Sequence, residues 1–286
     1  MRSDTALLYV SDTVGSIYVY SYPKLKLQAE VSGLNTYSAG ECVDLHGNVF
    51  VTTSSTASTG TIYEFSHGGT TPIAALSDPG SPAGCAVNPK NGDLAVTNIS
   101  DPSNPYSPHR GDLAIYKNAE GQAAMHYSDD TRFIAFLFCG YDSSGDLYLS
   151  AENAYDVGTS ILLRFSTDSG TFAVIDVGAA LDGLSSVQWD GQYMTVTSGE
   201  SAQKFEPVSI YRLTFSGSTA SIVGTTTLRV SKNRFSGQTW INNRKIVGHA
   251  RGTGDLLVWK YPKGSKPIER LRGAGILLWG VAVSRM

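Results

Sequence analysis

The side chains that could do chemistry in this sequence include three oxygen donors placed around a repeated phrase. Residues 40–53, "GECVDLHGNVFVTT", and residues 84–97, "GCAVNPKNGDLAVT", are nearly the same, but the first has Glu41 where the second has Cys85. Asp12 and Asn98 each follow an apolar run. Two carboxylates and an amide oxygen are ligands that Ca²⁺ or Mg²⁺ prefers. Asp12, Glu41 and Asn98 are therefore a candidate metal site.

Three further side chains could transfer a proton beside such a cation: Glu152, Glu200 and His249. A bound cation would polarise a scissile carbonyl and lower the pKa of a bound water, and one of the three would then act as the base. The alternative for Glu41 is structural, because a buried carboxylate can hold a loop by accepting its N–H groups. Ordinary hydrogen bonding is the same alternative for His249.

These residues must be positioned by short strands, because the chain repeats two phrases. The first phrase is a strand, a turn and a strand, at residues 42–53, 86–98, 140–151, 188–198 and 240–250. The second is an alternating strand with aromatic residues and a turn, at 15–24, 60–69, 111–121, 159–170, 208–218 and 254–264. Period-2 alternation indicates strands, and clusters of Gly, Asn, Asp and Pro indicate turns. A weaker fourth strand, such as "PIAAL" (72–76), completes each unit.

Four-stranded repeats of about 43–52 residues predict an all-β fold, a six-bladed β-propeller with four antiparallel strands in each blade. The N-terminal "ALLYVSD" (6–12) lacks a preceding strand, which "GVAVSRM" (280–286) can supply. We therefore expect the C-terminal strand to join the N-terminal blade and close one domain, 1–286. The expected blades are 1–31 plus 279–286, 38–78, 82–129, 133–178, 184–231 and 235–273.

The phrase "GECVDLHGNVFVT" resembles the repeats of NHL-type six-bladed propellers. Most of the chain also resembles uncharacterised bacterial NHL-like propeller proteins, through "HGGTTPIAAL", "GCAVNPKNGDLAVTN", "VQWDG" and the terminal "GVAVS". The resemblance implies that ligands meet the upper face, where the second and third strands of each blade are connected. A distant similarity to gluconolactonase-type hydrolases, which use Glu, Asn and Asp around a divalent cation, rests on residue types alone, since their "SNG…SPDG" type of segment is absent.

At the upper face we expect the strand ends Asp12, Asn98 and His249, and Glu41 at the top of the first strand of blade 2. Aromatic and charged side chains around them are candidate contacts for a small molecule, glycan, peptide or protein: Tyr37, Tyr106, His109, Arg110, Tyr155 and Trp279. Length in the loops that carry several of these residues favours a functional role.

Other polar and sulfur-bearing residues have structural explanations. A short polar side chain recurs at one position of the lower-face turn, where it bonds its own backbone, at Asp44, Asn88, Asp142, Asp190 and Asn242. Three cysteines are too few for a disulfide scaffold and lack metal-ligand spacing. Cys85 and Cys139 share a repeat position, so we expect small core residues there and no disulfide between blades.

Composition excludes some functions. The net charge is −3 with 16% charged residues, and the basic residues are loosely scattered from Lys260 to Arg272, so a nucleic-acid partner is not expected. No run of about 18–20 apolar residues predicts a membrane span. The Gly-, Ser-, Thr- and Tyr-rich composition favours a secreted or periplasmic protein whose signal peptide is absent from this sequence.

Two functions remain open, and the sequence does not decide whether the protein is an enzyme. The first is a binding module that recognises a glycan, peptide or protein at its upper face. It is favoured because the residues give no complete catalytic set, and no "GxSxG" follows a strand. The alternative is a divalent-metal-dependent hydrolase of the lactonase or esterase kind, with the cation at the upper mouth of the channel.

Overall fold

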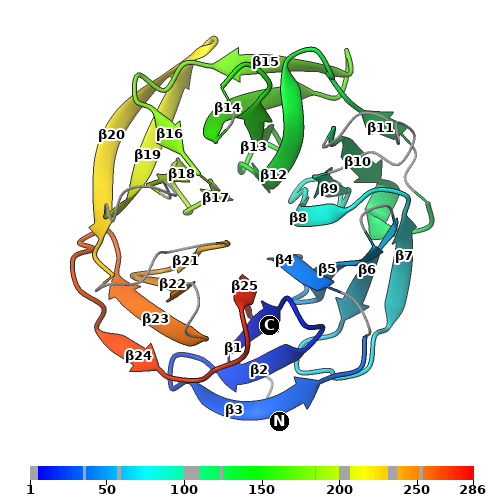
Figure 1. The fold of residues 1–286 in the computed structure, drawn as a ribbon, viewed down its shortest axis with the longest axis vertical. Helices are drawn as coiled ribbons and strands as arrows, with labels where there is room; N and C mark the ends of the chain where they lie inside the picture. Colours follow the sequence, from blue (N-terminus) through cyan, green and yellow to red (C-terminus); the bar gives the residue numbers. More distant parts are fainter. Residues whose placement is uncertain are drawn as a thin grey trace.

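The computed structural model describes residues 6–34, 37–56, 59–99, 110–122, 125–156, 158–183, 185–199, 207–230, 237–250 and 254–286. The described strands form six antiparallel sheets, arranged as blades around a central channel (Figure 1). This confirms the six-bladed β-propeller that the repeats predict. Among the described residues, no helix is long and apolar enough to cross a membrane.

The first three blades follow the chain from the N-terminus. Blade 1 contains β25 (Leu278–Ser284), β1 (Leu7–Asp12), β2 (Ile17–Ser21) and β3 (Lys26–Val31). Blade 2 contains β4 (Tyr37–Val43), β5 (Val49–Thr56), β6 (Thr59–Phe65) and β7 (Ala74–Asp78). Blade 3 contains β8 (Pro82–Val87), β9 (Leu94–Asn98), β10 (Leu113–Tyr116) and β11 (Met125–Tyr127), with the 3₁₀ turn η1 (Lys117–Ala119) after β10.

The other three blades complete the ring. Blade 4 contains β12 (Phe133–Tyr141), β13 (Leu147–Asn153), β14 (Thr159–Ser166) and β15 (Thr171–Ile175), and β16 (Leu181–Asp182) also pairs with β14. Blade 5 contains β17 (Val187–Trp189), β18 (Met194–Ser198), β19 (Val208–Ser216) and β20 (Thr219–Leu228). Blade 6 contains β21 (Trp240–Asn242), β22 (Lys245–Ala250), β23 (Asp255–Lys260) and β24 (Glu269–Leu271).

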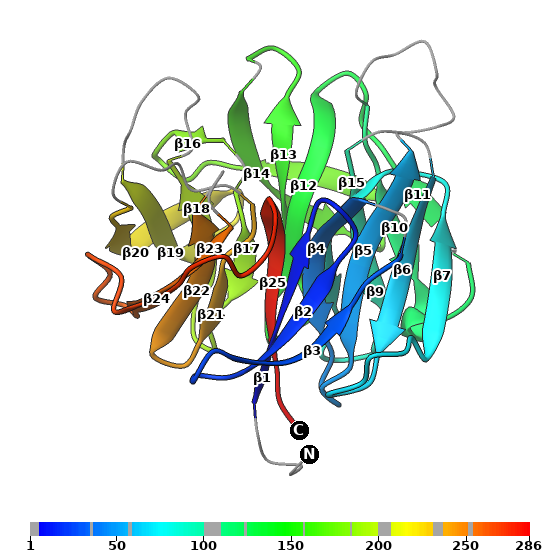
Figure 2. The same ribbon diagram turned by 60° about the horizontal axis from the view of Figure 1, so that its bottom comes forward.

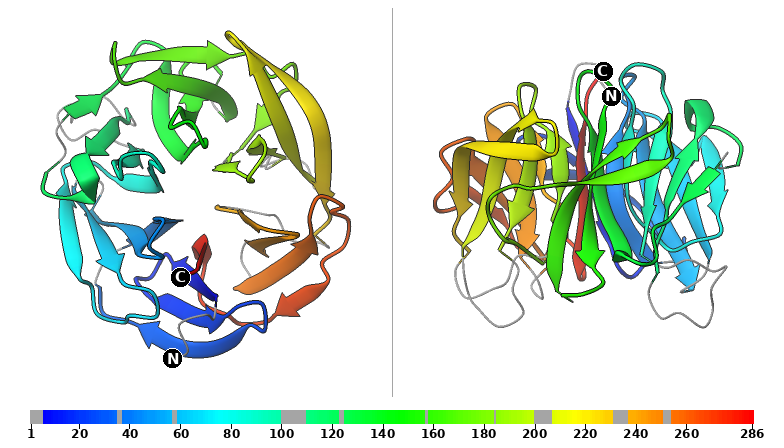
Figure 3. Two further views of the ribbon diagram at one scale, coloured as in Figure 1. Left: turned by 180° about the vertical axis from the view of Figure 1, so that it is seen from behind. Right: turned by 90° about the horizontal axis from the view of Figure 1, so that it is seen from above.

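The ring closes as the sequence predicts, with the C-terminal β25 as the innermost strand of blade 1. It pairs antiparallel with β1, and Val281 lies opposite Val10. The innermost strands run from the upper face to the lower face, so the C-terminus lies at the lower face (Figure 2). The edge-on view in Figure 3 shows the strands of each blade running between the two faces. The free edge of blade 1 is thereby paired, and both ends of the chain are tied into one sheet.

The apolar core lies between the blades. One cluster joins Cys42, Phe50 and Ile62 of blade 2 to Leu94 and Tyr116 of blade 3, and each is buried. Burying an apolar side chain of this size contributes about 1.5–3 kcal/mol, so blade faces that would be exposed alone stabilise one another. The alternating sequence pattern therefore buries both faces of these twisted sheets.

Hydroxyl groups tie neighbouring blades together at the wall of the channel. Ser11 Oγ donates to the Ala39 carbonyl, Thr97 Oγ1 to the Leu137 carbonyl, and Ser150 Oγ to the Ser185 carbonyl, each at 2.6 Å. Each bond starts from the second strand of one blade; the first two end on the first strand of the next blade, and the third ends on Ser185, two residues before β17. The Ser and Thr residues near the ends of these strands therefore satisfy buried carbonyls.

Candidate functional site

A cavity of about 570 Å³ lies at the upper mouth of the channel. The first strands of blades 2, 3 and 4 supply much of its wall. It is lined by Thr13, Tyr37, Ser38, Ala39, Ser54, Ser81, Pro82, Ala83, Ile99, Ala135, Leu137, Glu152 and Trp279. We call it the upper cavity. Three residues predicted from the sequence, Tyr37, Glu152 and Trp279, are thus brought to one place.

The upper cavity combines small apolar walls with a few polar groups. Tyr37 is 63% exposed at its rim. The Trp279 indole N–H and the Ser38 hydroxyl are buried and have no hydrogen-bond partner among the described residues. Glu152 is the only charged residue among the described ones that line it, and its Oε1 accepts the Gly158 N–H at 2.9 Å. Such a surface can hold an apolar or aromatic group and offer it hydrogen bonds.

Glu41 lies below this cavity, inside the channel wall. The strand β4 begins at Tyr37, four residues earlier than Glu41, so the mouth is formed by residues 37–39. The Glu41 side chain is fully buried against blade 1, where a Cβ on Gly280 would lie 3.0 Å from Glu41 Cγ. The expectation that Glu41 stands at the top of its strand is therefore wrong, because the strand extends further upward than the apolar pattern suggests.

The carboxyl group of Glu41 is poorly solvated. Neither oxygen makes a hydrogen bond of good geometry with a described residue. Burial raises its pKa to about 8, while the nearby Ser11 hydroxyl and Ala282 backbone act in the opposite direction. A carboxyl with this pKa is mainly protonated at pH 7. The predicted structural role as an acceptor of loop N–H groups is not what these contacts show.

The backbone of Glu41 is held by a residue that the sequence analysis did not single out. The Gln238 side chain accepts from the Glu41 N–H at 2.8 Å and donates to the Glu41 carbonyl at 2.6 Å. Gln238 Oε1, which accepts the Glu41 N–H, also accepts the Val281 N–H at 3.2 Å. Gln238 of blade 6 therefore links β4 of blade 2 to β25, the strand that closes the ring in blade 1. A lone Gln two residues before a strand gives only a weak sequence signal for this role.

Asp12 is occupied by its own turn. Its Oδ1 accepts the N–H groups of Val14 at 3.1 Å and Ser16 at 2.9 Å, and its Oδ2 accepts the Tyr18 hydroxyl at 3.2 Å. Successive side chains of a strand point to opposite faces, so Asp12 points away from the side on which Ser11 meets Glu41. These contacts explain Asp12 as the anchor of the turn from β1 to β2.

Asn98 belongs to a separate buried network in blade 3. Its Nδ2 donates to Asp112 Oδ1 at 2.6 Å, and Asp112 Oδ2 lies 2.7 Å from His126 Nδ1. Its amide packs against Gly80, where a Cβ would lie 2.6 Å from Asn98 Oδ1. Gly80 donates its N–H to Asp78, whose pKa is raised by burial. The network fixes the connection from blade 2 to blade 3.

The three predicted metal ligands thus have three separate sets of neighbours. Among the described residues, no group of three His, Cys, Asp or Glu side chains is placed to hold a metal ion. Glu41 faces a glycine, an alanine and a serine, whereas Ca²⁺ takes six to eight oxygen ligands. The residues around Glu41 do not fit a cation.

His249 is fully buried at the end of β22. Its Nε2 lies 3.1 Å from the Trp279 carbonyl, and a Cβ on Gly237 would lie 2.6 Å from the same nitrogen. Burial lowers its pKa to about 4, and the hydrogen bond to Trp279 opposes that change. His249 therefore supports the backbone beside Trp279 and is neutral at pH 7.

The remaining candidates are dispersed. Tyr155 is 83% exposed on the loop after β13. Arg110 lies 3.5 Å from Asp130 in an exposed ion pair. Glu200, Tyr106 and His109 lie outside the described residues.

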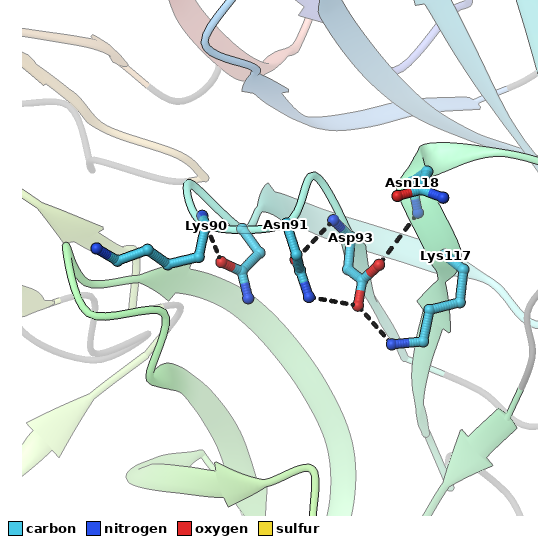
Figure 4. Close-up of polar contacts among 6 residues, drawn as sticks. Lys90, Asn91, Asp93, Lys117 and Asn118 are labelled. Atoms are coloured by element: carbon cyan, nitrogen blue, oxygen red, sulfur yellow. Dashed lines mark hydrogen bonds and ion pairs between the residues drawn. The ribbon is translucent and has the colours of Figure 1, made fainter.

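The lower face carries the predicted turn residues. Asp44, Asn88, Asp142 and Asp190 each accept the backbone N–H two residues further on, at 2.8–2.9 Å, which confirms their role. Asn242 differs, because its Oδ1 accepts from Arg285. Figure 4 shows the turn of blade 3, where Asp93 also binds Lys117 Nζ at 2.6 Å and the Asn118 N–H at 3.1 Å. These carboxylates stabilise hairpins.

A disulfide joins Cys42 of blade 2 to Cys85 of blade 3, and the prediction that no disulfide links the blades is wrong. The two cysteines are one repeat position apart, so on adjacent first strands they point toward each other. That offset was the available sequence signal. Cys139 is buried and free. All three line a second cavity of about 350 Å³ at the lower mouth, together with Gln238.

Comparisons with known proteins support the fold. No family model and no curated protein sequence matches the chain. The structure of a nidogen/laminin complex is similar with a TM-score of 0.68, 13% identity and 98% coverage of both chains. The structure of a functionally unknown protein from Desulfotomaculum acetoxidans is similar with a TM-score of 0.59 and 13% identity, covering 99% of both chains. The Myceliophteria thermophila Cps50 (Swd1) β-propeller domain is similar with a TM-score of 0.57 and 10% identity, covering 93% of this chain and 83% of that one.

Identities this low show the fold alone. The fold and the channel define the class of protein as a six-bladed β-propeller. The NHL-type repeat and the bacterial relatives stay predictions from the sequence.

Proposed function

We propose that the protein is a binding module that takes up its ligand in the upper cavity. The observation that carries this proposal is the cavity itself. Its volume of about 570 Å³ falls in the range of roughly 300–1,000 Å³ that is common for ligand sites. Its mainly apolar lining, with Tyr37 at the rim, suits a ligand with an apolar or aromatic face.

The ligand classes proposed are a glycan, a peptide or a segment of a protein. Aromatic side chains such as Tyr37 and Trp279 can stack on a sugar or enclose an apolar side chain. The similar structure of a nidogen/laminin complex comes from a protein–protein assembly, which favours a protein or peptide. The metal-dependent hydrolase stays a prediction, since no described contact around Glu41 supports it.

The test is a selection of a random heptapeptide library and a glycan array on the purified protein, followed by fluorescence polarisation with the recovered ligands. Tyr37→Ala and Trp279→Ala should each weaken binding at least about tenfold, a loss of about 1.4 kcal/mol. Leu45→Ala is the matched control, because Leu45 is 76% exposed and lines the lower cavity. Equal losses in all three variants, or losses only in the control, would refute the upper cavity as the site.

We also propose that the protein works outside the cytoplasm. The disulfide Cys42–Cys85 supports this, because disulfides persist in oxidising compartments. The protein is alkylated without reductant in a denaturing lysis buffer at its source, and mass spectrometry then counts the cysteines that reacted. One reactive thiol is expected, and three would contradict it.

A further inference from the structure

An outer groove lies between blades 5 and 6, remote from the channel. The last residues of β20 pair in parallel with the segment before β24: Ser265 donates its N–H to the Thr227 carbonyl at 2.6 Å and accepts the Arg229 N–H at 2.9 Å. Figure 1 shows the end of β20 reaching the blade of β23 and β24. Beside this short ladder lies a cavity of about 530 Å³, bounded by Arg229–Val230 and by residues 266–270.

The rim of the outer groove is positively charged. Arg229 and Lys266 are exposed, and neither forms an ion pair with a described residue. The one acid of the rim, Glu269, is neutralised by Lys245 at 2.7 Å. Arg270 is paired with Asp255. The groove therefore collects part of the basic scatter of residues 260–272, together with Arg229 from the next blade, in a chain whose net charge is −3.

The floor of the groove is apolar. Leu257 and Ala250 are buried beneath it, and Val230 and Pro267 are half-buried. Ile268 is 43% exposed at its edge. Cations that form no ion pair with a described residue, beside an exposed aliphatic surface, complement a ligand that has both carboxylates and an apolar side chain. The described lining contains no aromatic residue on which a nucleic-acid base could stack, which disfavours single-stranded nucleic acid.

The backbone at this place is also open to pairing. Among the described strands, β24 is the outermost of blade 6 and pairs only with β23. An extended peptide can add to such an edge through its main chain, while alternate side chains enter the neighbouring groove.

We propose that the outer groove docks an extended acidic segment of a partner protein. An apolar side chain of that segment packs on Val230 and Ile268, and its carboxylates face Arg229 and Lys266. The site is separate from the upper cavity and does not rest on the function proposed there.

The probe is a fluorescein-labelled nonapeptide of alternating Glu and Val, measured by fluorescence anisotropy at 50 mM and 200 mM salt. Matched peptides replace every Glu by Gln, or every Val by Ser, and a 12-nucleotide DNA strand represents the competing ligand class. We expect the Glu–Val peptide to bind at least tenfold more tightly than the other three probes and more weakly at the higher salt, because screening shortens the range of the charges.

Two charge reversals locate the site. The double variant Arg229→Glu with Lys266→Glu should weaken binding of the Glu–Val peptide at least tenfold, and Ile268→Ser should weaken it several-fold. Lys24→Glu with Lys26→Glu makes the same change in net charge on exposed residues of blade 1, and Ile73→Ser removes an isoleucine that is 58% exposed on blade 2. Both controls should leave the affinity unchanged. Circular dichroism and the melting temperature confirm folding of every variant.

Three results would overturn the proposal. The first is equal loss in the blade 1 control, which would mean general charge attraction. The second is tighter binding of the DNA strand than of the peptide. The third is a loss caused by Tyr37→Ala but not by the groove variants, which would place the peptide in the upper cavity and leave the function proposed there intact.

Discussion

The ionisation of Glu41 should control how the stability of this protein changes with pH. Burial raises the pKa of Glu41 from 4.5 to about 8. The folded state therefore keeps a proton that the unfolded chain releases above about pH 4.5, and stability falls as the pH rises through 8. His249 acts in the opposite direction, because burial lowers its pKa from 6.5 to about 4, and the unfolded chain gains a proton between these values.

The magnitude follows from the two pKa changes. Each unit contributes about 1.4 kcal/mol, so Glu41 alone would remove up to about 5 kcal/mol of unfolding free energy between pH 4.5 and 8. His249 adds stability at the same rate from about pH 4 to 6.5 and cancels this effect up to pH 6.5. These two groups alone would give a nearly constant stability from about pH 4.5 to 6.5, followed by a loss of about 2 kcal/mol by pH 8.

The assay is equilibrium unfolding in guanidinium chloride at several pH values from 4 to 8.5, followed by tryptophan fluorescence and circular dichroism. Coincident transitions allow the free energy to be extracted. Glu41→Gln should abolish the loss above pH 6.5 and reveal a rise of about 3 kcal/mol below it, due to His249. His249→Gln should instead show a continuous fall from pH 4.5 to 8.

The comparison uses the change of unfolding free energy with pH, because either substitution can also alter its absolute value. The other groups near Glu41 titrate elsewhere: burial raises the pKa of Tyr9 to about 12, and Ser11, Gly280 and Ala282 do not ionise in this range. If the wild type and Glu41→Gln show the same dependence between pH 6.5 and 8, then Glu41 is ionised or solvated in the folded protein. The account of its burial would then be refuted.

Three other changes test the contacts between blades. Ala86→Cys should form a second disulfide with Cys139, because the pair repeats the positions of Cys42 and Cys85 one blade further on. The number of reactive thiols should then fall from one to none, and the free energy of unfolding should rise by about 2–4 kcal/mol. Two reactive thiols would refute it. Gln238→Ala should cost about 3 kcal/mol or more in denaturant unfolding, because buried N–H groups lose their acceptor, while the exposed Gln192→Ala should change little. Chelator followed by excess Ca²⁺ should shift the melting temperature by less than about 1 °C, and a larger calcium-dependent rise would restore the metal site.

The sequence predicts the ring well because a blade is a local pattern. Alternating strands, turn residues at fixed offsets and the missing first strand before residue 6 identify six units and the closure by residues 280–286. The turn anchors Asp44, Asn88, Asp142 and Asp190 were predictable for the same reason, since each bonds a backbone group two residues away. Nothing in these contacts depends on distant parts of the chain.

The site was less predictable because its contacts cross the ring. The repeat pattern predicts how high along the channel a residue lies. The strand β4 starts a few residues earlier than the pattern indicates, so Glu41 lies in the channel wall and not at the mouth. The Gln238 contacts with Glu41 join residues 197 positions apart, and no spacing rule reaches that far. Tyr37 and Trp279 could be placed at the mouth because they lie at the start of the first strands β4 and β25. Their height along the channel was enough to predict that they line the upper cavity.

The contrast between Glu41 and Cys85 has a geometric explanation. At this repeat position the side chain points toward the preceding blade: Cys85 reaches Cys42 of blade 2, the Cys139 thiol lies 3.8 Å from the Ala95 carbonyl of blade 3, and Glu41 faces Gly280 and Ser11 of blade 1. The position therefore decides how adjacent blades are joined. Between blades 2 and 3 the joint is covalent, whereas between blades 1 and 2, where β4 packs beside the closing strand β25, it is a buried carboxyl whose proton is lost as the pH rises. Deprotonation of Glu41 should accordingly loosen the ring at its closure before any other joint, and amide hydrogen exchange of β25 should accelerate between pH 6.5 and 8 beyond the intrinsic rate, while that of β8 should not.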